Sequence, residues 1–170
     1  MSTSPAPLAA IDRAAGPLQL GFLTVLRDAN GYLGGYLVVN GWGRPLEFRL
    51  TSAVQPNRVQ QILYGDSLGS YVCADLIGKT LVEKAGIPVQ LVVTDREEVL
   101  DLRLKLDVPV AWLAPPDAGG AISCHPRFDA DGATVRGLLE RLDAAFDLAE
   151  PFQRIREAIG EARKMGVASR

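Results

Sequence analysis

The feature that most constrains the fold is a series of strand-like segments at the start of the chain. Residues 20–26 (LGFLTVL) are apolar on both faces, which is typical of a central strand. The Asn30-Gly31 step that follows predicts a hairpin turn, because both residue types tolerate a positive φ. A second strand is predicted at residues 36–40, entered through a bulge at the Gly-Gly pair 34–35. These segments predict an antiparallel hairpin.

A third strand is predicted at residues 45–51 (PLEFRLT), beyond a second turn at residues 40–43 (NGWG). Its apolar and polar residues alternate, which directs Glu47 and Arg49 to a face near water. Pro45 indicates that this strand starts at an edge or margin of the sheet. The chain therefore opens with a three-stranded antiparallel meander.

After residue 56 the pattern changes to helices that alternate with short apolar strands. Asp66 or Ser67 is expected to cap a long helix whose buried stripe includes Cys73 and Ile77, together with Leu76 and Thr80. A D-x-x-E sequence that starts at Asp95 is typical of a capping box. The predicted elements are helices at 58–64, 67–85, 96–106, 133–146 and 151–165, and strands at 89–94, 108–113 and 122–125.

This order predicts an α/β fold on the border with α+β, in which a mixed sheet opens with the meander and helices pack on it. Two helices end the chain. Residues 1–17 are rich in Ala, Pro and Ser and are expected to form a flexible tail, and residues 18–170 one domain. The N-terminus has no positively charged region before an apolar run, and no apolar stretch is long enough for a membrane span. We therefore expect a cytoplasmic protein with reduced cysteines and no membrane contact.

Charge and motifs exclude several classes of function. The net charge is −2 and neither half of the chain is basic, so the broad positive surface of a nucleic-acid-binding protein is absent. The sequence has no P-loop, no G-x-G-x-x-G after a strand, no G-x-S-x-G and no H-E-x-x-H. We therefore expect no cofactor and, on balance, no catalytic activity.

The single histidine, His125, follows Cys124 directly, so on a strand the two side chains would face opposite sides. Too few candidate ligands lie near them to predict a zinc site. A nucleophilic pair of the distant Cys73 with His125 stays formally open. The interpretation we favour is a hydrogen-bonded histidine at the end of a strand.

One candidate binding surface surrounds the second turn and the short helix at 58–64. Trp42 lies in the turn and Arg44 follows it, whereas Arg58 and Tyr64 flank the amide-rich helix. Trp, Tyr and Arg are the residue types that dominate protein-binding hot spots. Two interpretations stay open: a recognition surface, or a Trp42 ring folded over the core beside solvated polar side chains.

The predicted order of three antiparallel strands, helix, strand, helix, strand, helix resembles the ribonuclease H-like fold. That resemblance implies a divalent-metal-dependent nuclease, in which Asp28, Asp75 and Asp95 would hold two Mg²⁺ or Mn²⁺ ions. The fourth acidic residue would be one of Asp129, Asp131 and Asp143. The segment PLEFR is also similar to one in uncharacterised bacterial proteins, a resemblance that brings no function with it.

The sequence thus favours a non-enzymatic α/β module that binds a protein partner or a second copy of itself as a homo-oligomer. The alternative is a ribonuclease H-like nuclease domain, active or degenerate, and only this alternative implies nucleic acid as a partner. A small-molecule pocket between sheet and helices is a third possibility.

Overall fold

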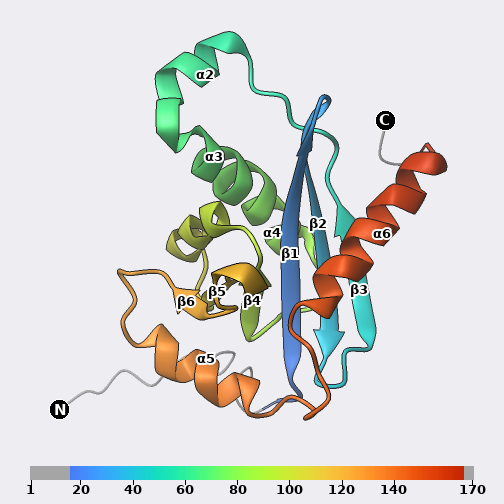
Figure 1. Cartoon of the computed structure of the whole chain (residues 1–170), viewed down its shortest axis with the longest axis vertical. Helices are drawn as coiled ribbons and strands as arrows, with labels where there is room; N and C mark the ends of the chain where they lie inside the picture. Colours follow the sequence, from blue (N-terminus) through green and yellow to red (C-terminus); the bar gives the residue numbers. More distant parts are fainter. Residues whose placement is uncertain (1–15, 167–170) are drawn as a thin grey trace.

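A computed structural model describes residues 16–166, so the tail predicted at 1–17 lies almost entirely outside the described residues. The predicted α/β fold is confirmed. One mixed sheet has the strand order β3-β2-β1-β4-β5-β6 (Figure 1). The strands are β1 (Gln19–Asp28), β2 (Gly31–Asn40), β3 (Pro45–Leu50), β4 (Leu91–Thr94), β5 (Val110–Leu113) and β6 (Ile122–Cys124).

Strands β1, β2 and β3 form the predicted antiparallel meander. β4 and β5 run parallel to β1, and β6 pairs antiparallel with β5. The turn between β1 and β2 differs from the expectation in one respect. Gly31 alone adopts a positive φ, 111°, whereas Asn30 does not, so the hairpin depends on one residue rather than on both.

Helical segments connect the parallel strands and complete the chain. Between β3 and β4 the chain forms five consecutive pieces: α2 (Arg58–Tyr64), η1 (Gly65–Ser67, 3₁₀), α3 (Leu68–Ser70), η2 (Tyr71–Gly78, a π-helix) and α4 (Lys79–Lys84). The later ones are the 3₁₀-helices η3 (Glu97–Lys105) and η4 (Pro116–Ala118), and the α-helices α5 (Asp131–Leu139) and α6 (Glu150–Lys164).

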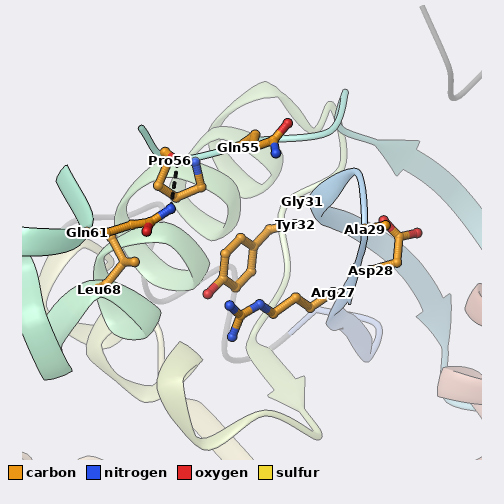
Figure 2. A pocket seen from close by; sticks show the side chains of 9 residues that line it. All are labelled: Arg27, Asp28, Ala29, Gly31, Tyr32, Gln55, Pro56, Gln61 and Leu68. Atoms are coloured by element: carbon orange, nitrogen blue, oxygen red, sulfur yellow. Dashed lines mark hydrogen bonds between the residues drawn. The ribbon is translucent and has the colours of Figure 1, made fainter. Parts of the chain in front are cut away.

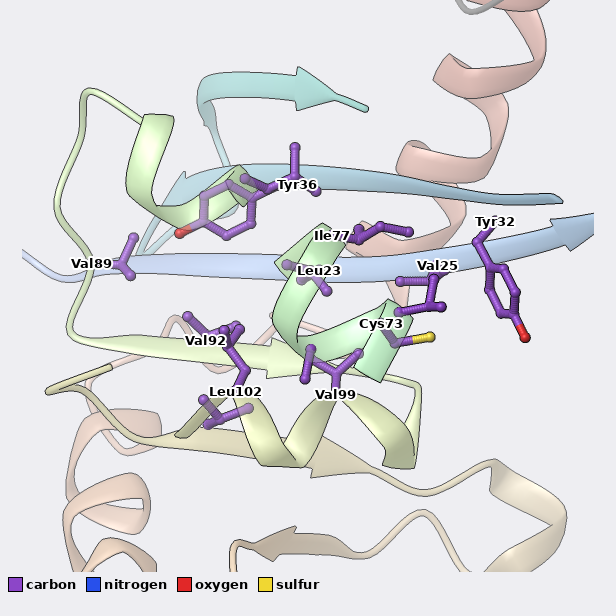
Figure 3. Close-up of a cluster of buried hydrophobic side chains, with 14 of the residues drawn as sticks. Leu23, Val25, Tyr32, Tyr36, Cys73, Ile77, Val89, Val92, Val99 and Leu102 are labelled. Atoms are coloured by element: carbon purple, nitrogen blue, oxygen red, sulfur yellow. The ribbon is translucent and has the colours of Figure 1, made fainter. Parts of the chain in front are cut away.

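The sheet has a hydrophobic cluster on each face. η2, α4 and η3 cover one face, where Leu23, Tyr36, Cys73 and Ile77 are buried together (Figure 3). α6 packs across β1 and β2 on the other face, where Phe152 contacts Phe22 edge to face. The last helix therefore docks on the sheet of its own domain. No helix between residues 16 and 166 is long and apolar enough to cross a membrane.

Gly34 and Gly35 are not a bulge but regular members of β2, paired with Val25 and Thr24 of β1. They are glycines because helices approach the strand closely from both sides. A Cβ on Gly34 would lie 2.2 Å from Cγ2 of Ile77, and one on Gly35 would lie 2.5 Å from Cγ2 of Ile155. The two glycines therefore set the distance between the sheet and both helical layers.

The long helix is continuous but does not have the predicted winding. Its middle, η2, is a π-helix, whose extra residue per turn rotates the face that meets the sheet. Cys73 and Ile77 are buried as predicted, whereas Leu76 and Thr80 are only half-buried. The predicted cap is absent too, because the Ser67 hydroxyl donates to the Tyr64 carbonyl oxygen instead of accepting at the helix start.

Candidate functional site

The helix α2 is fixed by local hydrogen bonds at both ends. The Asn57 side chain accepts from the Gln60 backbone N–H at 2.8 Å, and the Gln60 side chain accepts from the Asn57 N–H at 3.0 Å. This reciprocal pair is a capping box. At the other end, Gly65 takes a positive φ of 53° and its N–H donates to the Gln61 carbonyl oxygen. A helix of only seven residues is thereby given defined ends.

Aromatic stacking joins α2 to the rest of the helical segment. The rings of Tyr64 and Tyr71 lie 4.1 Å apart between centroids and are nearly parallel, at 12°. Tyr71 is the first residue of η2, which packs directly on the sheet. Tyr64, predicted as a binding residue, therefore also anchors α2 to the folded body.

None of the side chains of α2 is buried, although four of its seven residues are apolar or aromatic. Val59 and Ile62 are each 64% exposed, and Leu63 is 77% exposed. The spacing i, i+3, i+4 places the three aliphatic side chains on one side of the helix. We call Val59, Ile62 and Leu63 the α2 stripe. Such a stripe normally faces a core, and here it faces outward.

A cavity of about 280 Å³ separates α2 from the tip of the β1–β2 hairpin. Figure 2 shows Arg27 and Tyr32 extending side by side into this space, with Gln61 and Leu68 on its other side and Asp28 pointing away. The Arg27 guanidinium lies 5.1 Å from the centre of the Tyr32 ring. Gln61 is the residue of α2 that lines this cavity, so the exposed residues of the α2 stripe lie outside it.

The four predicted binding residues do not form one surface. Arg58 and Tyr64 belong to α2, whereas Trp42 and Arg44 belong to the β2–β3 turn at the opposite end of the sheet (Figure 1). Trp42 is 79% exposed, so its ring does not fold over the core. The Asn40 side chain orders this turn by accepting from the backbone N–H groups of Trp42 and Arg44, each at 3.0 Å.

Two of the three acidic residues suggested by the nuclease resemblance are paired with arginines of α6. Arg163 binds Asp28 at 2.6 Å, and the pKa of Asp28 is lowered first by a hydrogen bond from the Asn30 N–H and then by Arg163. Asp95 accepts from the Thr24 hydroxyl at 2.7 Å and binds Arg156. Asp95 is not a helix cap, because η3 begins without a side-chain cap.

The third acidic residue, Asp75, lies on η2, which covers the opposite face of the sheet from α6. The three carboxylates therefore do not converge. Between residues 16 and 166, no group of three or more His, Cys, Asp or Glu side chains is placed to hold a metal ion. The nuclease alternative stays a prediction for which the placement of these residues offers no support.

His125 is buried and both of its ring nitrogens are engaged. Nδ1 accepts from the Arg127 backbone N–H at 3.1 Å, and Nε2 lies 3.2 Å from Asp101. Cys73 is fully buried among apolar side chains, and this burial raises its pKa to about 11. The thiol is therefore protonated at neutral pH and is a poor nucleophile. The arrangement fits a hydrogen-bonded structural histidine.

The α2 stripe was missed by sequence reasoning, which attended to the amides and aromatic residues around it. Its signal is present in the chain, because Val59, Ile62 and Leu63 have helical spacing between Pro56 and Gly65. Pro56 precedes the helix and Gly65 ends it, so the helix is short and has little length with which to reach a core. The exposure of the stripe can therefore be predicted once the bounds of the helix are known.

A search against models of known protein families and a search of curated proteins both find no match to this chain. The function must therefore be inferred from the geometry of the molecule itself.

Proposed function

We propose that this chain is a protein-binding module and that α2 is the element it presents to its partner. One observation carries the proposal: α2 is ordered by a capping box and a tyrosine stack, yet it buries no side chain. Ordered apolar side chains that do not support the fold are typical of interaction sites.

The energetics favour covering the α2 stripe. Fully burying a Val, Leu or Ile side chain contributes about 1.5–3 kcal/mol. Val59, Ile62 and Leu63 keep most of their surface in water, so most of this free energy is still available for association. Their spacing is that of the anchor residues of a helix bound in a groove. Because the helix is already formed, binding does not have to supply the entropy of folding it.

The partner that fits best is a different protein with an apolar groove. A helix of seven residues is about 10 Å long, so two copies of α2 side by side would fall well short of the roughly 1,200 Å² of a stable interface. A groove contacts a helix from several sides and buries more of it. Arg58 begins the helix and Asp66 follows it, so a complementary groove carries acidic side chains at one end and basic ones at the other.

This function requires no chemical step and no bound cofactor. The cytoplasmic location expected from the sequence stays a prediction, as does a partner that is a protein rather than nucleic acid. Trp42 and Arg44 are too far from α2 to contact the same groove, and we leave them out of the proposed surface.

The test begins with a photo-reactive amino acid placed at Leu63 of the full chain in its native cells, and at Glu157 on α6 as the control. A protein cross-linked from position 63 and not from 157 is then purified and titrated with the wild type and with Leu63→Gln. We expect Leu63→Gln to raise Kd by at least about 30-fold, the effect of losing one hot-spot residue. Cross-linking only to a second copy of the chain, or an unchanged Kd, would contradict the proposal.

A further inference from the structure

The edge strand β3 carries a second feature, independent of α2. Within residues 16–166 no strand pairs with its outer side, so the backbone groups on that side are open. Its sequence from residue 46 to 50 is Leu-Glu-Phe-Arg-Leu. Read in either direction, this segment alternates apolar and charged residues, and the acidic residue in one direction takes the place of the basic residue in the other. The centre of this pattern is Phe48. A strand with an unprotected edge is a ready template for pairing with another chain.

We propose that β3 pairs antiparallel with β3 of a second copy about a two-fold axis at Phe48. Residues whose numbers sum to 96 then face each other. Glu47 of each copy lies opposite Arg49 of the other, Phe48 lies opposite Phe48, and Leu46 lies opposite Leu50. Opposite charges and aromatic pairs at facing positions both stabilise antiparallel strands. A two-fold interface is also the commonest way in which identical chains assemble.

The backbone register agrees with this arrangement. Thr51 donates to the Gly34 carbonyl oxygen at 3.0 Å, which directs the backbone groups of residues 49 and 47 toward β2 as well. Because these groups alternate along a strand, the N–H and C=O of Phe48 and Leu50 point outward. Pairing Phe48 with Phe48 therefore brings open donors opposite open acceptors. The bulge at Leu46, where the register shifts between Val38 and Val39, ends the regular segment.

The surroundings of β3 leave room for a second copy and are suitably charged. A hollow of about 570 Å³ adjoins the strand, lined by residues 48–52 and by Thr80, Leu81 and Lys84 of the helical layer. Lys84 adds a positive charge to this hollow beside Arg49, which also binds Glu47 of its own chain at 2.6 Å, and the charge of Lys84 suits the arriving Glu47. On the opposite face of the strand, Leu46 and Phe48 are each 38% exposed, so their apolar surface is free to pack against Leu50 and Phe48 of the second copy.

The experiment is sedimentation equilibrium of the purified full chain at concentrations from about 1 to 500 µM. We expect a reversible monomer–dimer equilibrium, and we expect Arg49→Glu to raise the dimer Kd by at least about tenfold, because it places like charges at both facing positions. Arg136→Glu on α5 changes the net charge equally at an exposed helical position and should leave the Kd unchanged.

A charge exchange makes the register itself testable. Arg49→Glu and Glu47→Lys should each weaken self-association, and mixing the two variants should restore a dimer that contains one of each, because every facing pair is then of opposite charge. The thermal unfolding of Glu47→Lys is recorded alongside, since Glu47 also accepts from Gly86 and Ile87 within its own chain.

A wild type that stays monomeric at 500 µM would overturn the β3 proposal, as would an unchanged dimer in Arg49→Glu. A dimer lost in Leu63→Gln and retained in Arg49→Glu would also overturn it, because α2 would then be the contact. If β3 pairing fails while Leu63→Gln still loses the cross-linked partner, the function proposed for α2 stands. The two proposals therefore fail separately.

Discussion

Glu47 is less exposed than Phe48, its neighbour on β3. The side chain of Glu47 is 15% exposed, whereas Phe48 is 38% exposed. The carboxylate lies against the end of the α4 segment, where it accepts from the Gly86 and Ile87 backbone N–H groups at 2.9 Å, and it also binds Arg49 at 2.6 Å. Glu47 thus holds the edge strand β3 against the segment that follows α4, whereas Phe48 is partly exposed to solvent.

The hydrogen bonds and the ion pair of the Glu47 carboxylate predict that the free energy of unfolding depends on pH. Hydrogen bonds from Gly86, then from Arg49 and Ile87, hold the pKa of Glu47 below its usual value. A carboxylate with a lowered pKa stabilises the fold above its unfolded pKa, near 4.5, and this contribution is lost as the pH falls below that value. We therefore expect Glu47→Gln to lower the free energy of unfolding at pH 7 by about 1 kcal/mol, and the difference from wild type to shrink toward pH 3. Urea unfolding at both pH values measures it. A difference that grows as the pH falls would contradict the assignment.

The close approach of α6 to the sheet predicts that one substitution on α6 compensates for a destabilising substitution at Gly35. Gly35→Ala should lower the free energy of unfolding by about 1–3 kcal/mol, because its Cβ meets Cγ2 of Ile155. Ile155→Leu removes that branch at Cβ while conserving volume. The double variant should therefore be less destabilised than the sum of the two single variants. Additive losses in a double-mutant cycle would show that the contact does not limit the approach.

The hydroxyl of Tyr36 predicts a substitution that costs little. It is buried beside Gly21 and has no hydrogen-bond partner among the described residues. Burial also raises the pKa of Tyr36. Because no bond is lost, Tyr36→Phe should change the free energy of unfolding by less than about 0.5 kcal/mol or increase it. Chemical denaturation measures this, and a loss above about 1.5 kcal/mol would contradict the expectation, because it would show that the hydroxyl has a hydrogen-bond partner.

The capping box of α2 predicts a local effect rather than a global one. Asn57→Ala should destabilise α2 by about 1 kcal/mol, because Asn57 and Gln60 satisfy each other's backbone groups. Amide hydrogen exchange should then accelerate at residues 60–64, with little change in the core strands. Since α2 buries no side chain, the global free energy of unfolding should change less than the local one. Equal changes in both would show that α2 folds as one unit with the sheet.

Local signals predicted much of the fold. The apolar strands, the turn at Asn40 and the short helical segment at residues 58–64 depend on residues close in sequence, and all of them are present in the structure. Features that depend on distant residues were not predictable in this way. The Gly34-Gly35 pair is required by the close approach of helices that begin more than thirty residues later in the chain. Asp95 does not cap a helix as expected, because it binds the distant residues Thr24 and Arg156 instead.

The candidate site was predicted only in part. Arg58 and Tyr64 lie on the helix that we propose as the binding element. The sequence predicts one surface that they share with Trp42, but Trp42 lies in the β2–β3 turn at the other end of the sheet. Whether an apolar stripe is covered depends on the path of the chain in three dimensions. The pattern Val59, Ile62, Leu63 predicts a helix face and leaves open whether a core lies beneath it.

The most direct test of the central claim measures two quantities on Leu63→Gln, the free energy of unfolding and the Kd for the partner captured through position 63. Leu63 is 77% exposed, so its replacement should change the free energy of unfolding by less than about 0.5 kcal/mol, while Kd rises by at least about 30-fold. A protein that loses stability while its Kd stays constant would show that the α2 stripe serves the fold and not a partner.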